Sequence, residues 1–241
     1  MTTVDILAIA AHRDDVELTC GGTLIKAAAQ GHSTGILDLT AGEMGTRGSA
    51  QLRAEEAARA TAVLGVSVRE NLGLPDAGIE NTPATREQLV RVIRRLRPSV
   101  VIAPAPPPAG RHPDHRIASQ LIRDAVFVAG LQKVAPDVPR HRPRKVIHAL
   151  AYREDAIKPT FVVDISDEFE RKLEAIRCYA SQFDEAVQAG EVYPNGEPLY
   201  DVVRHQAAHY GTLIRTRYGE PFFTFETMMV SDVMGLEVSS F

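Results

Sequence analysis

The sequence predicts an α/β fold, with a mostly parallel sheet covered by helices on both faces and a C-terminal helix and strand extension. Short apolar runs alternate with amphipathic segments through the first 165 residues, as expected of repeated strand–helix–strand units. The first of these runs is apolar at nearly every position, which is typical of a strand buried on both faces. Hydrophobic residues make up 44% of the 241 positions, enough for a sizeable core.

The first strand is expected at residues 4–10, where an apolar run ends at a cluster of polar side chains. A helix is predicted over residues 20–29, and it ends before Gly31 because glycine favours helix termination. Residues 34–39 form a second apolar run and are predicted as a strand, followed by a glycine-rich loop at 41–48.

A second helix is predicted over residues 51–64, followed by a short strand near 66–72. A third helix is expected to end before Pro98, since apolar residues before it recur at helical spacing at Leu89, Val92, Ile93 and Leu96.

Residues 99–103 are again apolar and predict a strand that leads into a stiff proline-rich loop at 104–109. A helix that starts at Pro113 would carry an apolar face through Ala129. Further strands are expected at 145–152 and 161–165.

The chain changes character after residue 165. A long helix is predicted over residues 167–183, then a turn-rich stretch to Pro198, another helix and a last strand near 222–230. We expect one domain over residues 1–241, with a Rossmann-like α/β core at 1–165 and an extension at 166–241 packed on it.

Composition excludes several classes of function. The net charge of −4 gives no electrostatic reason to expect a nucleic-acid or anionic-membrane partner. Cys20 and Cys178 are too far apart in sequence to suggest a disulfide framework or a thiolate metal site, and free thiols are expected. The apolar run at residues 6–11 is too short for a signal or a membrane span, so a cytoplasmic protein is expected.

Two polar clusters follow predicted strands. His12, Asp14 and Asp15 come directly after the first strand, and His112 and His115 come after the fourth and its loop. Ligands in open α/β sheets bind beyond the carboxyl ends of the strands, so both clusters are expected to converge at one edge. Residues three apart share a helix face, which allows both later histidines to face one cleft.

These residue types indicate metal-assisted amide hydrolysis. A catalytic zinc keeps three protein ligands and an open position, and His12, Asp15 and His115 fit that inventory. Asp14 is then free to take a proton from water. His112 would stabilise an oxyanion, with Asp114 orienting its ring.

Two other classes of function remain open. Two histidines and a carboxylate also form the facial triad of non-haem iron oxygenases, although that reading gives Asp14 no role. A sugar-binding or regulatory protein without turnover is the other alternative, which the complete set of ligands and base disfavours.

The two clusters resemble the signature motifs of the PIG-L/LmbE-like family of zinc-dependent sugar de-N-acetylases. The similarity extends through the stretches 11–23, 40–56, 111–115, 175–183 and 218–222. It implies zinc on His12, Asp15 and His115, although Fe²⁺, Co²⁺ or Mn²⁺ would also suit these ligands. It also implies Asp14 as general base and His112 as electrostatic catalyst.

The resemblance also implies how substrate is bound. Arg53 matches a family arginine that contacts sugar hydroxyls, and Glu43, Arg47 and Arg111 are weaker candidates for substrate contacts. Within the family the motifs look most like the bacillithiol-pathway branch, which deacetylates N-acetylglucosaminyl-malate. An inositol-linked conjugate or a chitooligosaccharide is the alternative amino-sugar substrate.

Two further expectations come from the resemblance. Family members are often hexamers, so it implies a homo-oligomer. Arg13 stands where the family usually has proline, and it places a cation beside the predicted ligands. It would either depress the pKa of Asp14 or point to solvent.

Overall fold

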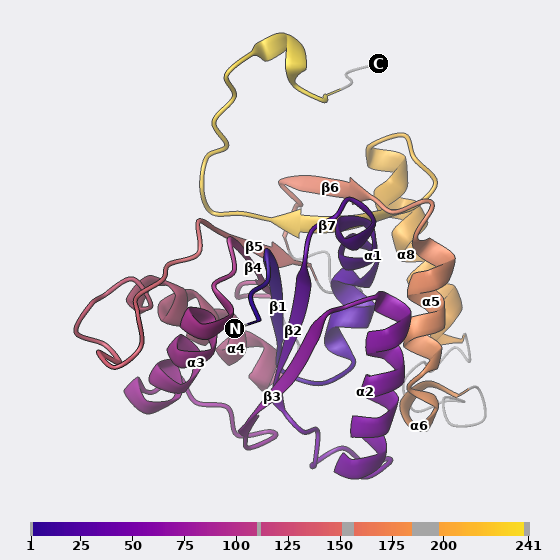
Figure 1. Cartoon of the computed structure of the whole chain (residues 1–241). Coiled ribbons are helices and arrows are strands. Elements are labelled where there is room, and N and C mark those ends of the chain that lie inside the picture. Colours follow the sequence, from indigo (N-terminus) through magenta and orange to yellow (C-terminus); the bar gives the residue numbers. More distant parts are fainter. Residues whose placement is uncertain (1, 110–111, 151–156, 185–197, 239–241) are drawn as a thin grey trace.

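A seven-stranded sheet in the order β3-β2-β1-β4-β5-β7-β6 runs through the middle of the protein, as seen in the computed structural model (Figure 1). The structure describes residues 2–109, 112–150, 157–184 and 198–238. The strands are β1 (Ile6–Ala10), β2 (Thr34–Thr40), β3 (Val68–Leu74), β4 (Val100–Pro104), β5 (Lys145–Ala149), β6 (Phe161–Asp164) and β7 (Gly219–Phe223).

The predicted α/β class is confirmed. Strands β3, β2, β1, β4 and β5 pair in parallel, in the order of doubly wound folds. Strand β7 runs antiparallel to both of its neighbours, β5 and β6. Because β7 lies between those two strands, the C-terminal segment supplies a strand inside the sheet and does not merely pack on the core.

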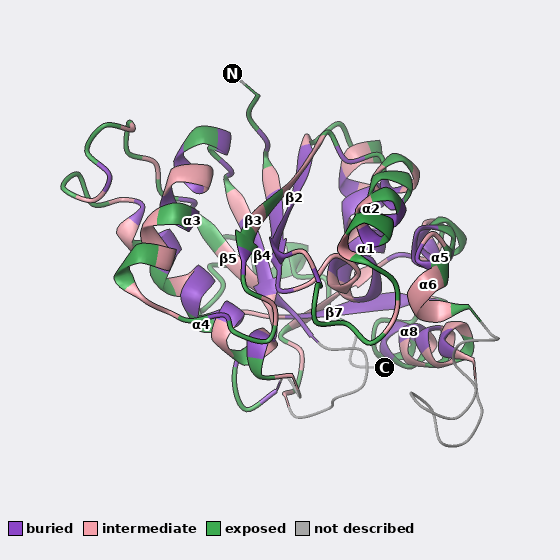
Figure 2. Ribbon diagram, turned by 90° about the horizontal axis from the view of Figure 1, so that it is seen from below, coloured by how far each residue is buried: buried purple, intermediate pink, exposed green. Residues whose placement is uncertain are grey.

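Helices cover both faces of the sheet, so that the central strands are buried and the outer helix faces are exposed (Figure 2). The side chains of β1 alternate between two cores, as the two-residue period of a strand requires. Leu7 and Ile9 face one core, and Ala8 and Ala10 face the other. The helices are α1 (Asp15–Ala29), α2 (Ala50–Leu64), α3 (Pro83–Leu96), α4 (Pro113–Val128), α5 (Phe169–Arg177), α6 (Ala180–Phe183), α8 (Leu199–Leu213) and the 3₁₀ turn η1 (Val233–Gly235).

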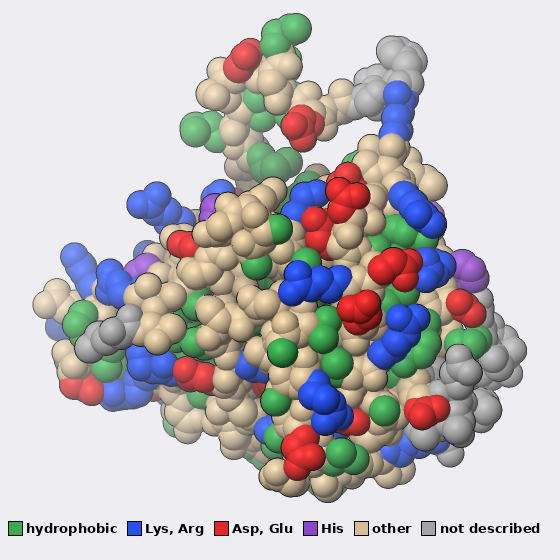
Figure 3. Space-filling model, turned by 45° about the vertical axis from the view of Figure 1, so that its right-hand side comes forward, with side chains coloured by type: hydrophobic (Ala, Val, Ile, Leu, Met, Phe, Trp, Pro, Cys, Tyr) green, Lys and Arg blue, Asp and Glu red, His purple; other side chains and the backbone are tan. Residues whose placement is uncertain are grey.

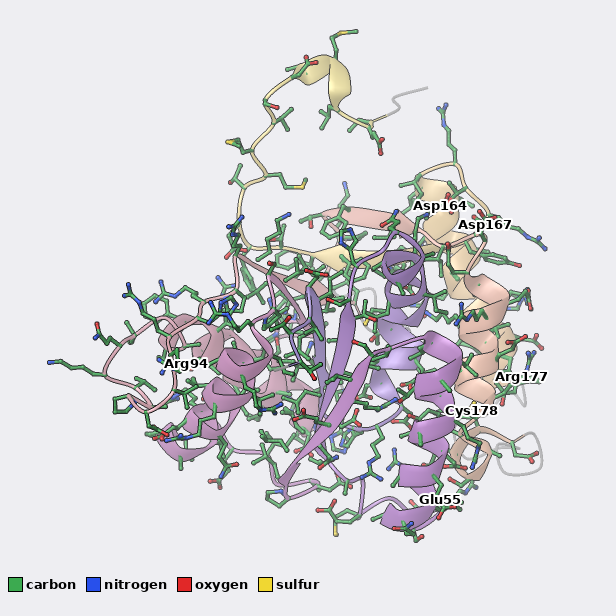
Figure 4. The ribbon with its side chains drawn as sticks, viewed as in Figure 1. Glu55, Arg94, Asp164, Asp167, Arg177 and Cys178 are labelled. Carbon is green, nitrogen blue, oxygen red and sulfur yellow. The ribbon has the colours of Figure 1, made fainter. Side chains whose placement is uncertain are left out.

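Three predicted boundaries are wrong. Helix α1 begins at Asp15 and not at residue 20, and it is kinked at Cys20, where φ is −144°. The predicted helix 167–183 is divided into α5 and α6 around Cys178, which lies at the end of α5 (Figure 4). The last strand ends at Phe223, so most of the predicted strand 222–230 is not a strand.

A buried ion pair joins the two halves of α1. In a regular helix the N–H of Gly22 would donate to the carbonyl of Leu18. Here the N–H of Gly22 donates to Glu220 at 2.9 Å, and Lys172 Nζ donates to the Leu18 carbonyl at 2.9 Å. Lys172 and Glu220 also pair directly at 2.6 Å, with side chains 3% and 2% exposed. Glu220 further accepts from the N–H and hydroxyl of Thr23, so the kink leaves these polar groups satisfied.

The segment after β7 leaves the body of the protein as an extended arm (Figure 1). We call residues 224–238 the C-terminal arm. It contains η1 and no other helix or strand. Across the described residues, no helix has the length and apolar character needed to cross a membrane.

Replacing Lys172 with Met tests the role of the buried pair. Lys172→Met keeps the side-chain length but leaves Glu220 buried without its cation, so we expect unfolding to become easier by about 3–5 kcal/mol. Urea unfolding followed by circular dichroism measures the change.

The control is Glu170→Gln, which removes a partner of Arg204 from a more exposed pair. It should change the free energy of unfolding by less than about 1 kcal/mol. An unfolding midpoint for Lys172→Met equal to that of the parent would show that the pair does not hold α1.

Candidate active site

The two predicted clusters meet at the carboxyl ends of β1 and β4, which lie side by side in the sheet. Helix α1 follows β1 onto one face of the sheet, while α4 follows β4 onto the other. The strand order reverses at this point, and such a switch point opens the crevice in which doubly wound folds bind ligands.

His12, Asp15 and His115 converge there. His12 Nδ1 lies 3.2 Å from His115 Nε2 and 3.4 Å from Asp15 Oδ2. His115 Nε2 lies 3.1 Å from Asp15 Oδ1. The three side chains come from the β1–α1 turn, the first residue of α1 and the first turn of α4.

This group fits a divalent metal ion. Donors about 2.0–2.1 Å from a tetrahedral zinc lie about 3.3 Å from one another, close to the separations of these atoms. A second set of potential donors, His12, His112 and Asp114, is also close together. Its carboxylate is already occupied by the N–H groups of Ala77 and Ile79. The first group is therefore the better metal site.

The charges around the imidazoles favour a cation. Burial lowers the pKa of His12, but Asp15, Asp14 and Asp76 outweigh it and raise that pKa to about 9. Burial raises the pKa of Asp15, but His115 and His12 bring it well below its usual range. A divalent cation would supply the positive charge that protonated imidazoles otherwise provide.

Asp76 is a site residue that the sequence did not reveal. Its Oδ1 lies 3.1 Å from His12 Nε2, and its side chain is 6% exposed. A carboxylate on the second nitrogen of a metal-binding histidine fixes the orientation of the ring and its tautomer. Asp76 lies in the loop after β3, a loop to which the sequence assigned no function, and only the sheet order brings it to His12.

Asp14 lies outside the convergent group and is held by Arg53. Arg53 Nη2 is 3.1 Å from Asp14 Oδ1, and Nη1 donates to the carbonyl of Gly42 at 3.2 Å. Gly42 has φ +72°, and a Cβ there would lie 2.1 Å from Nη1. The glycine-rich loop therefore needs glycine at this position to let the buried guanidinium reach Asp14.

His112 caps α4. Its Nδ1 accepts the backbone N–H of Asp114 at 3.2 Å, so the ring is oriented by the backbone. The carboxylate of Asp114, predicted from the sequence to orient this ring, instead accepts the N–H groups of Ala77 and Ile79. Burial, together with His12 and His115, lowers the pKa of His112.

Arg13 does not simply point to solvent, which was one of the two expectations for it. Its Nη1 donates to the carbonyl of Ala50, at the start of α2, at 2.8 Å. Burial lowers its pKa. The guanidinium that contacts Asp14 belongs to Arg53 instead.

The carbonyl of Arg13 accepts hydrogen bonds from Arg69 and from the hydroxyl of Tyr179. Arg69 also pairs with Glu17 at 2.6 Å and Asp38 at 2.9 Å, with all three side chains at most 8% exposed. This buried cluster fixes the turn that carries His12 and Asp14. A charged residue inside the apolar second strand, Asp38, was the one signal for it in the sequence.

The remaining predicted contacts are placed as follows. The carboxylate of Glu43 accepts the N–H of Asp76 at 2.8 Å, so it braces the loop that holds His12. The carbonyl of Arg47 accepts from Gln182 Nε2 at 2.8 Å, which ties the glycine-rich loop to α6. Arg111 lies outside the described residues.

Comparisons with known proteins identify the family of the chain. A family model described as PIG-L, GlcNAc-PI de-N-acetylase, matches residues 7–126, which include both clusters. The diacetylchitobiose deacetylase of Thermococcus kodakarensis is 36% identical over 224 residues, covering 89% of this chain and 80% of that protein.

Two solved structures are also similar. A conserved protein from Thermus thermophilus superposes with a TM-score of 0.84 at 39% identity, covering 95% of this chain and 98% of the other. The N,N'-diacetylchitobiose deacetylase from Pyrococcus horikoshii superposes with a TM-score of 0.77 at 30% identity, covering 90% of this chain and 82% of the other.

Replacing Asp76 tests its support of His12. Asp76→Ala should weaken zinc binding about 10–100-fold, because the ring of His12 loses the carboxylate that orients it. Competition with a chromophoric zinc chelator measures the affinity. The control is Asp201→Ala, an exposed carboxylate on α8 that should leave the affinity unchanged. Equal zinc affinity in Asp76→Ala and the parent would show that this contact is not functional.

Proposed function

The chain belongs to the PIG-L family of de-N-acetylases, and we propose that it removes the acetyl group from an N-acetylglucosamine unit of a short chitooligosaccharide with a bound divalent metal ion. The observation that carries this proposal is the convergence of His12, Asp15 and His115, within 3.1–3.4 Å of one another. Asp14 stands apart from that group on Arg53, and so remains free for proton transfer.

The proposed chitooligosaccharide substrate differs from N-acetylglucosaminyl-malate, which the sequence motifs favoured. Two similar proteins, at 36% and 30% identity, are diacetylchitobiose deacetylases and match most of both chains. They support the chitooligosaccharide alternative better than the malate conjugate.

The metal would be held by His12, Asp15 and His115. When bound, a divalent cation of this kind polarises a carbonyl and acidifies water. Zinc is the first choice for two imidazoles and a carboxylate, although other transition metals accept the same donors.

Asp14 is the proposed general base. Its carboxylate is 13% exposed, and Arg53 holds one oxygen in place. A base whose position is fixed before substrate arrives needs no reorganisation when it takes the proton from the attacking water. The same carboxyl group can return that proton to the leaving amine as the C–N bond breaks, which yields acetate and a free amino sugar.

His112 is the proposed donor to the oxyanion. Because its Nδ1 accepts the N–H of Asp114, the neutral ring carries its proton on Nε2 and can donate from there. Its ring centroid is 4.9 Å from that of His12 and 5.5 Å from that of His115. A neutral donor would suit a site that also holds a divalent cation, and it would stabilise negative charge that develops on the carbonyl oxygen.

The oxygenase alternative is less well supported. A facial triad would use His12, Asp15 and His115 but would leave the Asp14–Arg53 pair without a role. A binding protein without turnover would equally have no use for a positioned base.

We expect the zinc-loaded protein to release free amine fastest from N,N'-diacetylchitobiose when it is offered a panel of N-acetylglucosamine conjugates. The panel contains the malate and inositol conjugates and the free sugar, and fluorescamine detects the product. Asp14→Ala should keep its zinc content but lose at least about 100-fold in kcat, the lower end of what a general base contributes.

Matched controls separate the base from the ligands. His12→Ala should lose zinc as well as activity, and metal analysis by mass spectrometry distinguishes the two variants. Full activity in Asp14→Ala would refute the assignment of the base. Fastest turnover of the malate conjugate would restore the substrate that the sequence favoured, and turnover that requires oxygen would refute the hydrolase.

A further inference from the structure

A small apolar pocket lies beside the metal-binding group. Its volume is about 60 Å³, and Asp15 and His115 form part of its wall. The remaining wall comes from α1 and from the carboxyl ends of β1, β4 and β5, and includes Ala8, Ala10, Cys20, Ile102, Ala105 and Ala149.

Two features of the chain create this space. Ala8, Ala10 and Ala149 place only methyl groups on the sheet face toward α1, where larger side chains would fill the pocket. The kink at Cys20 changes the course of α1 where it passes over these strands. The hydroxyl of Thr19, which also lines the pocket, is bonded to the Asp15 carbonyl at 2.7 Å.

We propose that this pocket binds the acyl chain of the substrate and that it accepts a chain one carbon longer than acetyl. The proposal rests on the deacetylase function proposed above. An amide carbonyl carbon carries three substituents: an oxygen, a nitrogen and the first carbon of the acyl chain. The oxygen would lie at the metal-binding group and the nitrogen carries the sugar, so the acyl chain would extend in the remaining direction.

The position of the pocket relative to the site residues supports this direction for the acyl chain. Asp15 and His115 are in the wall of the pocket, whereas Asp14 and Arg53 are not. The pocket therefore borders the metal-binding group but not the proposed base. Its apolar wall offers no charged partner to a sugar hydroxyl beyond the metal-binding side chains, but it suits a hydrocarbon chain.

Volume sets the expected chain length. A methyl group is about the size of a water molecule, and a cavity volume of about 10–15 Å³ is enough to hold one water. A pocket of about 60 Å³ therefore has room for the acetyl methyl and at least one further carbon. Burying one more methylene group is favourable by about 0.8 kcal/mol, which corresponds to about a fourfold gain.

A series of N-acylglucosamines with formyl, acetyl, propanoyl and hexanoyl groups tests the proposal. We expect kcat/KM to rise about fourfold from acetyl to propanoyl, and to fall at hexanoyl. In Ala149→Val, which fills the pocket, the ratio of propanoyl to acetyl hydrolysis should drop below one. Ala125→Val, a buried substitution in the core on the opposite face of the sheet, should keep the parent ratio.

Binding provides a readout that does not depend on turnover. In the inactive Asp14→Asn protein loaded with zinc, saturation transfer in NMR should be strongest at the acyl protons of N-propanoylglucosamine and weaker there in the Ala149→Val background. A parent that hydrolyses acetyl at least tenfold faster than propanoyl overturns the pocket assignment but leaves the deacetylase intact. Absence of hydrolysis with every amide in the series would overturn the proposed function itself.

The C-terminal arm carries a second, independent inference. Met229, Val233 and Met234 on the arm are 93%, 79% and 92% exposed. Figure 3 shows the arm standing off the body, with its hydrophobic side chains in solvent. Large apolar side chains exposed together on one segment indicate an interaction site.

The root of the arm is fixed to the body. The guanidinium of Arg123 lies over the ring of Phe225, with its Cζ 4.2 Å from the ring centroid of Phe225. The Phe225 ring also packs edge-on against His148. Glu226 pairs with Arg123 at 3.1 Å. The arm therefore leaves the body in a defined direction.

We propose that the arm docks on a second copy of this chain, at the end of α4. Phe127 and Leu131 are 60% and 40% exposed there. The neighbouring stretch 140–145 is strongly basic, and its Arg142 stacks over Phe127 at 4.7 Å. Arg94 of α3 holds this face in place, because its Nη2 donates to the carbonyl of Leu131 at 2.7 Å (Figure 4).

Charge supports this pairing. The arm holds Glu226, Asp232 and Glu237 and no lysine or arginine, so its charge opposes that of the basic stretch. The face lies one helical turn beyond Arg123, beside the root of the arm. Two copies related by a twofold axis would therefore exchange arms reciprocally, as an isologous contact requires.

Disulfide trapping in a Cys178→Ser background tests the exchange. Met229→Cys and Phe127→Cys are made in separate proteins, mixed and mildly oxidised. We expect a covalent dimer in the mixture, and light scattering should give the parent a mass at least twice the 26.3 kDa of one chain. A chain that ends after Glu226 should be a monomer.

Three outcomes would overturn the proposal: a monomeric parent, an assembly that survives removal of the arm, or no covalent dimer between the two single-cysteine proteins.

Discussion

The site depends on the hydrogen bonds that hold the carbonyl of Arg13. This group lies in the turn between β1 and α1, between the predicted ligand His12 and the predicted base Asp14, and it accepts from Arg69 and Tyr179. Arg69 is itself fixed by Glu17 and Asp38. The buried guanidinium of Arg69 thus joins α1, β2, β3 and the active-site turn. Buried charged groups keep one arrangement, because any other arrangement would leave a buried charge unpaired.

The C-terminal segment completes this support. Tyr179 reaches the turn, Gln182 holds the glycine-rich loop at Arg47, and Ser181 donates to Glu56 of α2. The break between α5 and α6 allows side chains that are close in sequence to reach three different parts of the site. Glu220 and Lys172 act in the same way on α1, where they satisfy the groups that the kink exposes.

The electrostatics of the site follow from how these supports are arranged. Four carboxylates, those of Asp14, Asp15, Asp76 and Asp114, surround His12. Of these, Asp14 is the one that forms an ion pair with Arg53. Asp15 faces the two imidazoles, whereas Arg53 keeps Asp14 apart from them. Neighbouring aspartates can therefore have different duties, with one suited to metal binding and the other to proton transfer.

The sequence by itself determined the α/β class and the meeting of the two histidine clusters at one edge of the sheet. It could do so because strand and helix periodicity and the parallel order of strands are local or topological properties. It did not reveal Asp76, Arg69, the kink of α1 or the position of β7 inside the sheet. Those depend on contacts between segments far apart in the chain, such as Glu220 with Gly22. Only the tertiary structure decided which carboxylate faces the imidazoles and which faces an arginine, because that choice is made by packing and by the pairing of buried charges.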